Sequence, residues 1–238
     1  MDFDTQADTR VAEVALRLQE SGAVALLHSL ISTMWAANVA RFDSGLGDTA
    51  LSLGIQCSEN LASQLYRRRQ DSDLTGTGLV VRQSNKTTFC TFEDATLRFV
   101  KAPVESELQP DWSDGFSWNS HVRQEAALLN DQTYRAPKRV PGIEPLIDAS
   151  GTGNAGQLNQ FFIIWNGLRG ELPLTAGWLT IPSLHEDLVI GVKELWRDAP
   201  STGGVRVPSV SDAPHESAAE PTVSITLKKN LREAQRGK

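Results

Sequence analysis

The chain has little cysteine, and it lacks the residue patterns that mark many catalytic and metal-binding families. It has two cysteines, too few for a disulfide framework, and no Cys or His pair has zinc-finger spacing. Neither an HExxH segment nor a GxSxG elbow occurs. Its apolar runs fall far short of the about 20 residues that a membrane span needs. We therefore expect no zinc finger, no zincin peptidase, no elbow-type hydrolase and no membrane contact.

What is present is an ordinary globular composition. The 238 residues are 40% hydrophobic and 22% charged, and 23 Lys and Arg against 29 Asp and Glu give a net charge of −6. This length is sufficient for a substantial core. The first ten residues are acidic and polar, unlike a signal peptide. These features favour a folded protein of a reducing compartment, and we expect it to be cytoplasmic.

Helical periodicity dominates residues 1–70. Apolar residues recur every three or four positions before and after Ser21-Gly22, which interrupts the pattern. Asp48 is expected to cap a short helix that Gly54 ends, and Ser58 to cap the next helix, which runs to about Arg69. Cys57 lies beside that second cap, where the helix dipole would lower its pKa.

Residues 79–197 change to strand character. The strand-like segments of this region are interrupted by a short helix after Ser120, with Val122, Ala126 and Leu129 inward. A long loop from Asp131 to about Asn159 follows that helix. Asn166-Gly167 is expected to form a turn. The predicted strands are 79–81, 87–92, 97–100, 161–165, 175–181 and 187–192. The fold class is therefore α+β: N-terminal helices followed by a mostly antiparallel sheet of about six strands, in one domain over 1–197.

The C-terminal part has a different composition. Pro, Ser, Gly and Ala dominate 198–221, which we expect to be a flexible, disordered linker. A basic tail follows at 222–238, and its alternating residues Ile225 and Leu227 could add a strand to a sheet edge. Trp112 and Trp118 lie in a polar loop, where they form a contact surface or fold back over the sheet. These four side chains are the predicted partner-binding residues.

Residues 48–69 also suggest DNA binding. Two short helices separated by Gly54 resemble a helix-turn-helix. The motif expects an apolar residue six positions after Gly54, but that position is Asn60 and Leu61 comes one place late. The second helix would present its polar face to a major groove, and three consecutive arginines could contact phosphates. The candidate nucleic-acid-binding residues are Asn60, Gln64, Arg67, Arg68 and Arg69. The acidic net charge argues against this alternative.

A third hypothesis is a nuclease that depends on a divalent metal. Asp43 and Asp48 precede the predicted meander, and Glu93 and Asp94 lie within it, so the four carboxylates are candidate Mg²⁺ ligands. No acidic-x-Lys triplet supports them, and Glu93-Asp94 is equally typical of a turn. The GxGxxG match at 151–156 has no surrounding βαβ unit, which favours a flexible loop. We predict no catalytic residue and no cofactor.

Two segments resemble a loose class of small bacterial and phage-borne proteins. They are Arg41 to Ala50, followed by Leu53-Gly54, and Phe161 to Gly167, followed by a strand and Pro182. The resemblance covers about a fifth of the chain and implies a mobile, toxin–antitoxin or defence-type genetic context, with no ligand residues carried over. The leading hypothesis is a non-catalytic protein–protein interaction or regulatory module. DNA-binding regulator and metal-dependent nuclease are the alternatives.

Overall fold

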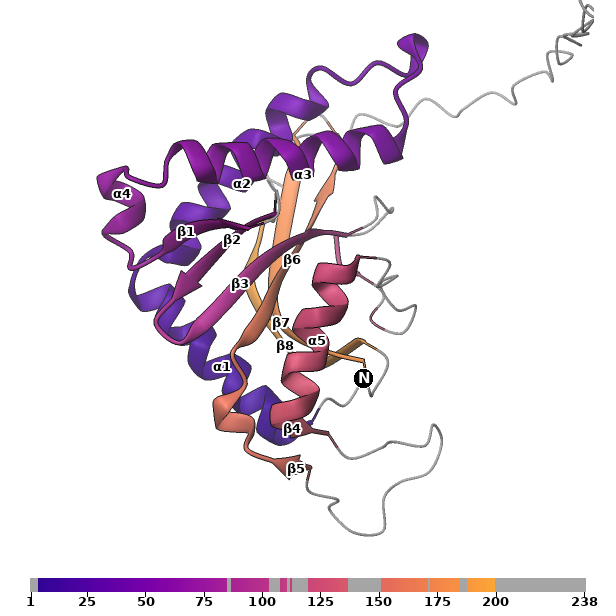
Figure 1. Ribbon diagram of the computed structural model, residues 1–238. Coiled ribbons are helices and arrows are strands. Elements are labelled where there is room, and N and C mark those ends of the chain that lie inside the picture. The colour runs from indigo at the N-terminus through magenta and orange to yellow at the C-terminus, as the bar shows by residue number, and fades with distance from the viewer. Residues whose placement is uncertain are drawn as a thin grey trace, which may run out of the picture. The chain divides into compact units, whose positions relative to one another are not determined.

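The computed structural model describes residues 4–84, 87–102, 108–110, 112, 120–136, 151–170, 172–184 and 188–199. Helices come first along the chain and strands follow, with one further helix between the two halves of the sheet (Figure 1). The predicted α+β class is confirmed. The described residues include only the first two positions of the predicted linker, 198 and 199, and none of the tail, so both stay predictions, as do the roles given to Ile225 and Leu227.

A six-stranded sheet is the centre of the fold. Its strand order is β1-β2-β3-β6-β7-β8, and every neighbouring pair is antiparallel except β3 and β6, which are parallel. The short strands β4 (Tyr134–Arg135) and β5 (Thr152–Gly153) pair separately. The bounds of the six are β1 (Val80–Ser84), β2 (Thr87–Phe92), β3 (Ala95–Lys101), β6 (Gln160–Leu168), β7 (Leu174–Ser183) and β8 (Leu188–Arg197).

Strand β6 is buried on both faces, which suits its five consecutive apolar residues. Phe161, Ile163 and Trp165 enter the large core beneath the N-terminal helices, whereas Phe162 and Ile164 enter a second cluster on the opposite face. This alternation follows from the two-residue period of a strand. The sheet therefore carries helices on both faces.

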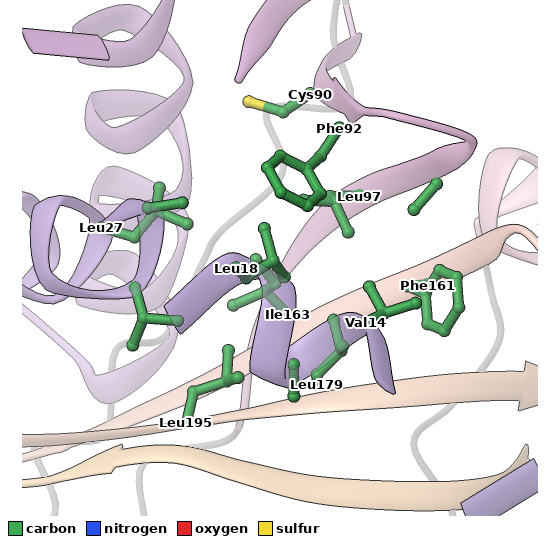
Figure 2. Close-up of a cluster of buried hydrophobic side chains, with 14 of the residues drawn as sticks. Val14, Leu18, Leu27, Cys90, Phe92, Leu97, Phe161, Ile163, Leu179 and Leu195 are labelled. Carbon is green, nitrogen blue, oxygen red and sulfur yellow. The ribbon is translucent and has the colours of Figure 1, made fainter. Parts of the chain in front are cut away.

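Helices α1 (Thr5–Glu20) and α2 (Ala23–Val39) cover the first face. Their apolar side chains belong to one buried cluster that includes side chains of all six strands, and Figure 2 shows Val14 and Leu18 among residues from the sheet. The predicted interruption at Ser21-Gly22 is confirmed, because Gly22 has a φ of 80°. No single helix of the described ranges is long and apolar enough to span a membrane; α1 and α2 pass that test only as a pair, bent by 81°.

Helix α5 (His121–Thr133) packs on the opposite face (Figure 1). Its inward residues are Ala126, Ala127 and Asn130, so the predicted inward position of Leu129 is wrong. The Asn130 amide donates to the carbonyls of Gln160 and Pro182 at 2.8 and 3.0 Å, and its oxygen accepts from Gln160 N at 3.2 Å. One buried side chain thereby joins the helix to two strands, and the helix continues past the predicted loop start at Asp131.

Helix α3 (Ala50–Arg67) corrects the expected pair of short helices. Thr49, not Asp48, is its N-cap and shares a capping box with Ser52. The buried stripe Leu53, Cys57, Leu61 and Leu65 continues across Gly54, so packing outweighs the cost of about 1 kcal/mol for one glycine in a helix. A short helix α4 (Ser72–Thr75) follows. The helix-turn-helix interpretation of 48–69 is therefore wrong.

The expected turn at Asn166-Gly167 is also wrong. Both residues lie inside β6, paired with Ala176 and Thr175 of β7. A Cβ on Gly167 would lie 2.4 Å from Cε2 of Trp35. Glycine is needed here because the indole of Trp35 packs against the strand backbone.

The glycines of the GxGxxG segment have a structural role as well. A Cβ on Gly151 would overlap the Tyr134 hydroxyl, and a Cβ on Gly153 would lie 2.3 Å from the Thr133 carbonyl oxygen. Both glycines therefore let β5 approach the end of α5 and β4 closely. The 3₁₀ helix η2 (Ala155–Gln157) comes next, and the Asn154 side chain accepts from Gly156 N at its start.

Candidate functional site

The solvent side of α3 exposes large apolar side chains. Leu51 is 73% exposed, Ile55 52% and Tyr66 38%, and Leu46 of the preceding 3₁₀ helix η1 (Ser44–Leu46) is 86% exposed. Ala62 lies among them, half-buried. We call these five residues the α3 outer surface. Single exposed leucines are common on proteins, but a row along one helix is an unusual concentration.

Helical geometry explains why these residues share one side. Positions 51 and 55 are four apart, and positions 51 and 66 are 15 apart, close to four full turns. The opposite side carries the buried stripe, which packs on α2 and on strands β1 to β3. α3 is therefore covered on one side by the described fold, and its solvent side carries Leu51, Ile55 and Tyr66 among polar residues such as Ser58 and Glu59.

Charges differ between the two ends of α3. At the N-terminal end, the Asp48 carboxylate accepts from Asp43 N at 3.0 Å, and Asp43 in turn accepts from Gly45 N at 2.8 Å. At the C-terminal end, Arg69 donates to the Tyr66 carbonyl at 2.7 Å, and its guanidinium lies 4.2 Å from the Tyr66 ring centre. The arrangement is acidic where the helix dipole is positive and basic where it is negative.

The candidate nucleic-acid-binding residues do not form one surface. Asn60 donates to Asn38 of α2 at 2.8 Å, so it faces the protein interior rather than a groove. Arg68 pairs with Asp71 at 3.1 Å, and Arg69 is held against Tyr66. Gln64 and Arg67 are exposed on α3. Nucleic-acid binding by these residues stays a prediction. The pair of short helices that suggested it is a single helix in the structure.

The candidate metal ligands are split between two places. Glu93 and Asp94 form the turn between β2 and β3, as the alternative interpretation had it, and Glu93 has a φ of 50°. Arg17 binds Glu93 at 2.9 Å, and Arg10 binds Asp94 at 2.5 Å. Asp43 and Asp48 instead cap the η1 segment. Over the described ranges, no group of three His, Cys, Asp or Glu side chains could hold a metal ion.

Lys101 is a half-buried cation that the sequence did not single out. Its Nζ lies 5.2 Å from the Trp35 ring centre and 5.1 Å from that of Trp165. It donates to the Ala102 carbonyl at 2.8 Å and to Asn166 Oδ1 at 3.1 Å. Burial lowers the pKa of Lys101 to about 8. The signal was the alternation of β3, which places Lys101 on the same face as buried Ala95 and Leu97.

The two thiols are poor nucleophiles. Burial raises the pKa of Cys90 to about 12, which keeps this thiol protonated and inert. Burial also raises the pKa of Cys57 to about 11. The expected lowering is wrong because Cys57 lies inside α3, on its buried side, and not at a helix start.

A polar cluster joins α2 to the end of β8. His28 Nε2 lies 2.7 Å from Asp198 Oδ1, and the same carboxylate accepts from Thr175 N at 2.7 Å and from Thr175 Oγ1 at 3.0 Å. Ser32 Oγ lies 2.8 Å from that Thr175 hydroxyl, and the His28 ring stacks on Trp196. Ser32 thus contacts the threonine, while His28 contacts the carboxylate. The cluster fixes the chain as it leaves the sheet.

Of the predicted partner-binding residues, only Trp112 lies in the described part of the chain. It is half-buried, and its ring meets Trp178 of β7 edge to face at 5.8 Å. This is the second of the two predicted arrangements, in which the loop aromatic folds back over the sheet. Trp118, Ile225 and Leu227 lie outside the described residues.

Comparison with known proteins adds no relative. No protein-family model, no curated protein and no solved structure matches the chain. The resemblance of residues 41–50 and 161–167 to small bacterial and phage-borne proteins stays a prediction. Any functional conclusion therefore rests on the residues described above.

Proposed function

We propose that the chain is a non-catalytic protein–protein interaction or regulatory module that binds through the α3 outer surface. The observation that carries this proposal is the exposure of three large apolar side chains on the solvent side of a helix whose other side packs in the core. These side chains are Leu51, Ile55 and Tyr66. Exposed apolar rows of this kind mark contact surfaces on soluble proteins.

The energetics favour a protein partner. Fully burying one Leu or Ile side chain contributes about 1.5–3 kcal/mol, so covering Leu51 and Ile55 supplies a substantial part of a binding free energy. Tyr66 and Arg69 belong to the residue types that dominate binding energies, and their ring contact limits the loss of side-chain freedom on binding. The charged helix ends provide the polar rim typical of an interface.

The buried titratable groups support a non-catalytic role. Both thiols have raised pKa values, and Lys101 has two oxygen acceptors and two aromatic neighbours. The carboxylates of the β2–β3 turn are held by two arginines. Each of these groups contributes to the fold through the contacts it already makes.

A co-purification experiment tests the proposal. The wild type and a Leu51→Arg/Ile55→Arg variant are purified from native cells after nuclease treatment, and bound proteins are identified by mass. Leu128→Arg on α5 is the matched control, because Leu128 is also a 49% exposed leucine on a helix. We expect the α3 variant to lose a stoichiometric protein, either another protein or an untagged copy of the chain, that the control retains.

The opposite result is equally clear. If the α3 variant keeps every bound protein, the α3 outer surface is not the contact surface and the proposal fails. A chain that ends at Asp198 isolates the contribution of the predicted tail. Nucleic acid bound to untreated wild type, with no protein partner, would return the arginines at 67–69 to consideration.

A further inference from the structure

Four of the five residues of the α3 outer surface, all except Leu46, are arranged symmetrically about one point. Leu51 lies as far before the Ser58–Glu59 peptide bond as Tyr66 lies after it. Ile55 and Ala62 are related in the same way, and so are Asp48 and Arg69 beyond the two ends of the helix. When a second copy of this helix is turned by 180°, each of these positions faces its counterpart.

We propose that the partner of this surface is a second copy of the chain, packed with its α3 antiparallel across a two-fold axis at Ser58–Glu59. The inference rests on the proposed function, because it names the occupant of the same surface. In a two-fold interface each contact occurs twice. Leu51 then lies beside Tyr66 of the partner subunit, and Ile55 lies beside Ala62 of the partner subunit.

Charge complementarity selects the antiparallel orientation. It places the acidic end, with Asp43 and Asp48, beside Arg67 and Arg69 of the partner subunit, and it aligns the two helix dipoles head to tail. A parallel pair would instead place the arginine-rich ends together. The small Ala62 side chain leaves room for the larger Ile55 of the partner subunit, which lets the two helices approach closely.

Glu59 provides a further constraint on the interface. It is exposed and lies next to the proposed axis, so the two Glu59 carboxylates come near each other at the interface margin. Like charges there weaken association. Glu59→Gln is therefore expected to tighten the dimer severalfold, an effect that binding of an unrelated partner does not predict.

Sedimentation equilibrium of the full-length protein over a concentration series tests the dimer. A contact of essentially one helix per subunit is small, so we expect a dissociation constant of about 10 micromolar. The series therefore extends to a protein concentration of about 300 micromolar. The average mass of the wild type should rise from 26.0 kDa toward twice that value. Ile55→Arg should weaken association at least tenfold, because it places two arginines in the interface, whereas Leu128→Arg should behave as wild type.

Disulfide cross-linking tests the orientation. Under mild oxidation Ser58→Cys should cross-link to itself, and Ala62→Cys should cross-link only when mixed with Ile55→Cys. The natural Cys57 and Cys90 are both fully buried, so their thiols do not compete. In a parallel pair, Ala62→Cys would cross-link readily with itself.

Two results would overturn this inference. One is a wild-type mass of 26.0 kDa at every concentration, and the other is efficient cross-linking of Ala62→Cys alone. A monomeric chain whose α3 variant still loses a different protein in co-purification would leave the proposed function standing. Failure of the dimer and failure of the interaction surface are thus separate outcomes.

Discussion

Replacing Lys101 by methionine tests how one half-buried cation sets the pH dependence of stability. In the folded chain the pKa of Lys101 is about 8, compared with an ordinary value of 10.5, because burial between Trp35 and Trp165 disfavours the charged form. A difference of this size corresponds to roughly 3 kcal/mol of lost stability while the lysine is charged in both states.

The sign follows from proton binding. Below about pH 8 both the folded and the unfolded chain hold the proton, so the penalty is fully present. Between about pH 8 and pH 10.5 the folded chain has released the proton and the unfolded chain has not, so the free energy of unfolding rises with pH. Integrated over the two pKa values, the wild type should gain about 1 kcal/mol between about pH 7 and pH 9 relative to Lys101→Met.

Urea denaturation of both proteins, followed by circular dichroism at several pH values, measures this difference. The two thiols ionise in the unfolded chain near their ordinary pKa of 9.0, which lowers the stability of both proteins equally and cancels in the difference between them. Lys193→Met on exposed β8 is the control and should follow the wild type. Parallel pH profiles for the wild type and Lys101→Met would refute the reasoning.

Three further substitutions test the packing of the fold by urea denaturation. Gly167→Ala should lower the free energy of unfolding by about 1–3 kcal/mol because its Cβ would overlap Trp35. Gly54→Ala has open space on α3 and should raise that free energy by about 0.5–1 kcal/mol. Equal effects of the two substitutions would contradict the packing argument. Asn130→Ala should cost about 2–4 kcal/mol because it leaves three buried backbone groups of the sheet without their partner, and a loss below about 1 kcal/mol would show that these bonds matter little. Arg10→Met should cost about 1–3 kcal/mol because a buried carbonyl before β6 loses its donor, with an unchanged midpoint as the contrary result.

Local patterns predicted most of the sheet correctly. The segment 87–92 is β2 to the residue, and 161–165 lies inside β6, because β-branched and aromatic runs suit a pleated, partly buried surface. Gly22 was placed correctly since a glycine between two apolar periods commonly marks a change of helix direction. These features depend on residues that are close in sequence.

Glycine at 54 and at 167 could not be interpreted from its neighbours. Gly54 looked like a helix end, but the buried side chains of α3 hold the helix together through it. Gly167 looked like a turn, but Trp35 from α2 needs the space above it. In both cases a distant element decides the local conformation, which explains why propensity alone gave the wrong structure.

The candidate site shows the same division. Sequence placed Arg67, Arg68 and Arg69 near the end of a helix, and the structure added that Arg68 and Arg69 already have partners. The exposure of Leu51 and Ile55 could not be predicted, because an apolar helical residue is equally compatible with a core. Only the positions of α2 and of strands β1 to β3 determine which side of α3 is buried.

The sequence by itself determined the α+β class, the six strands and the separation of α1 from α2, because each depends on a period of two or about 3.6 residues. The tertiary structure alone decided the parallel pairing of β3 with β6, the enclosure of Lys101 by two indoles and the exposed side of α3. These features join segments far apart in the chain, so their physical cause is packing and solvent exclusion rather than local propensity.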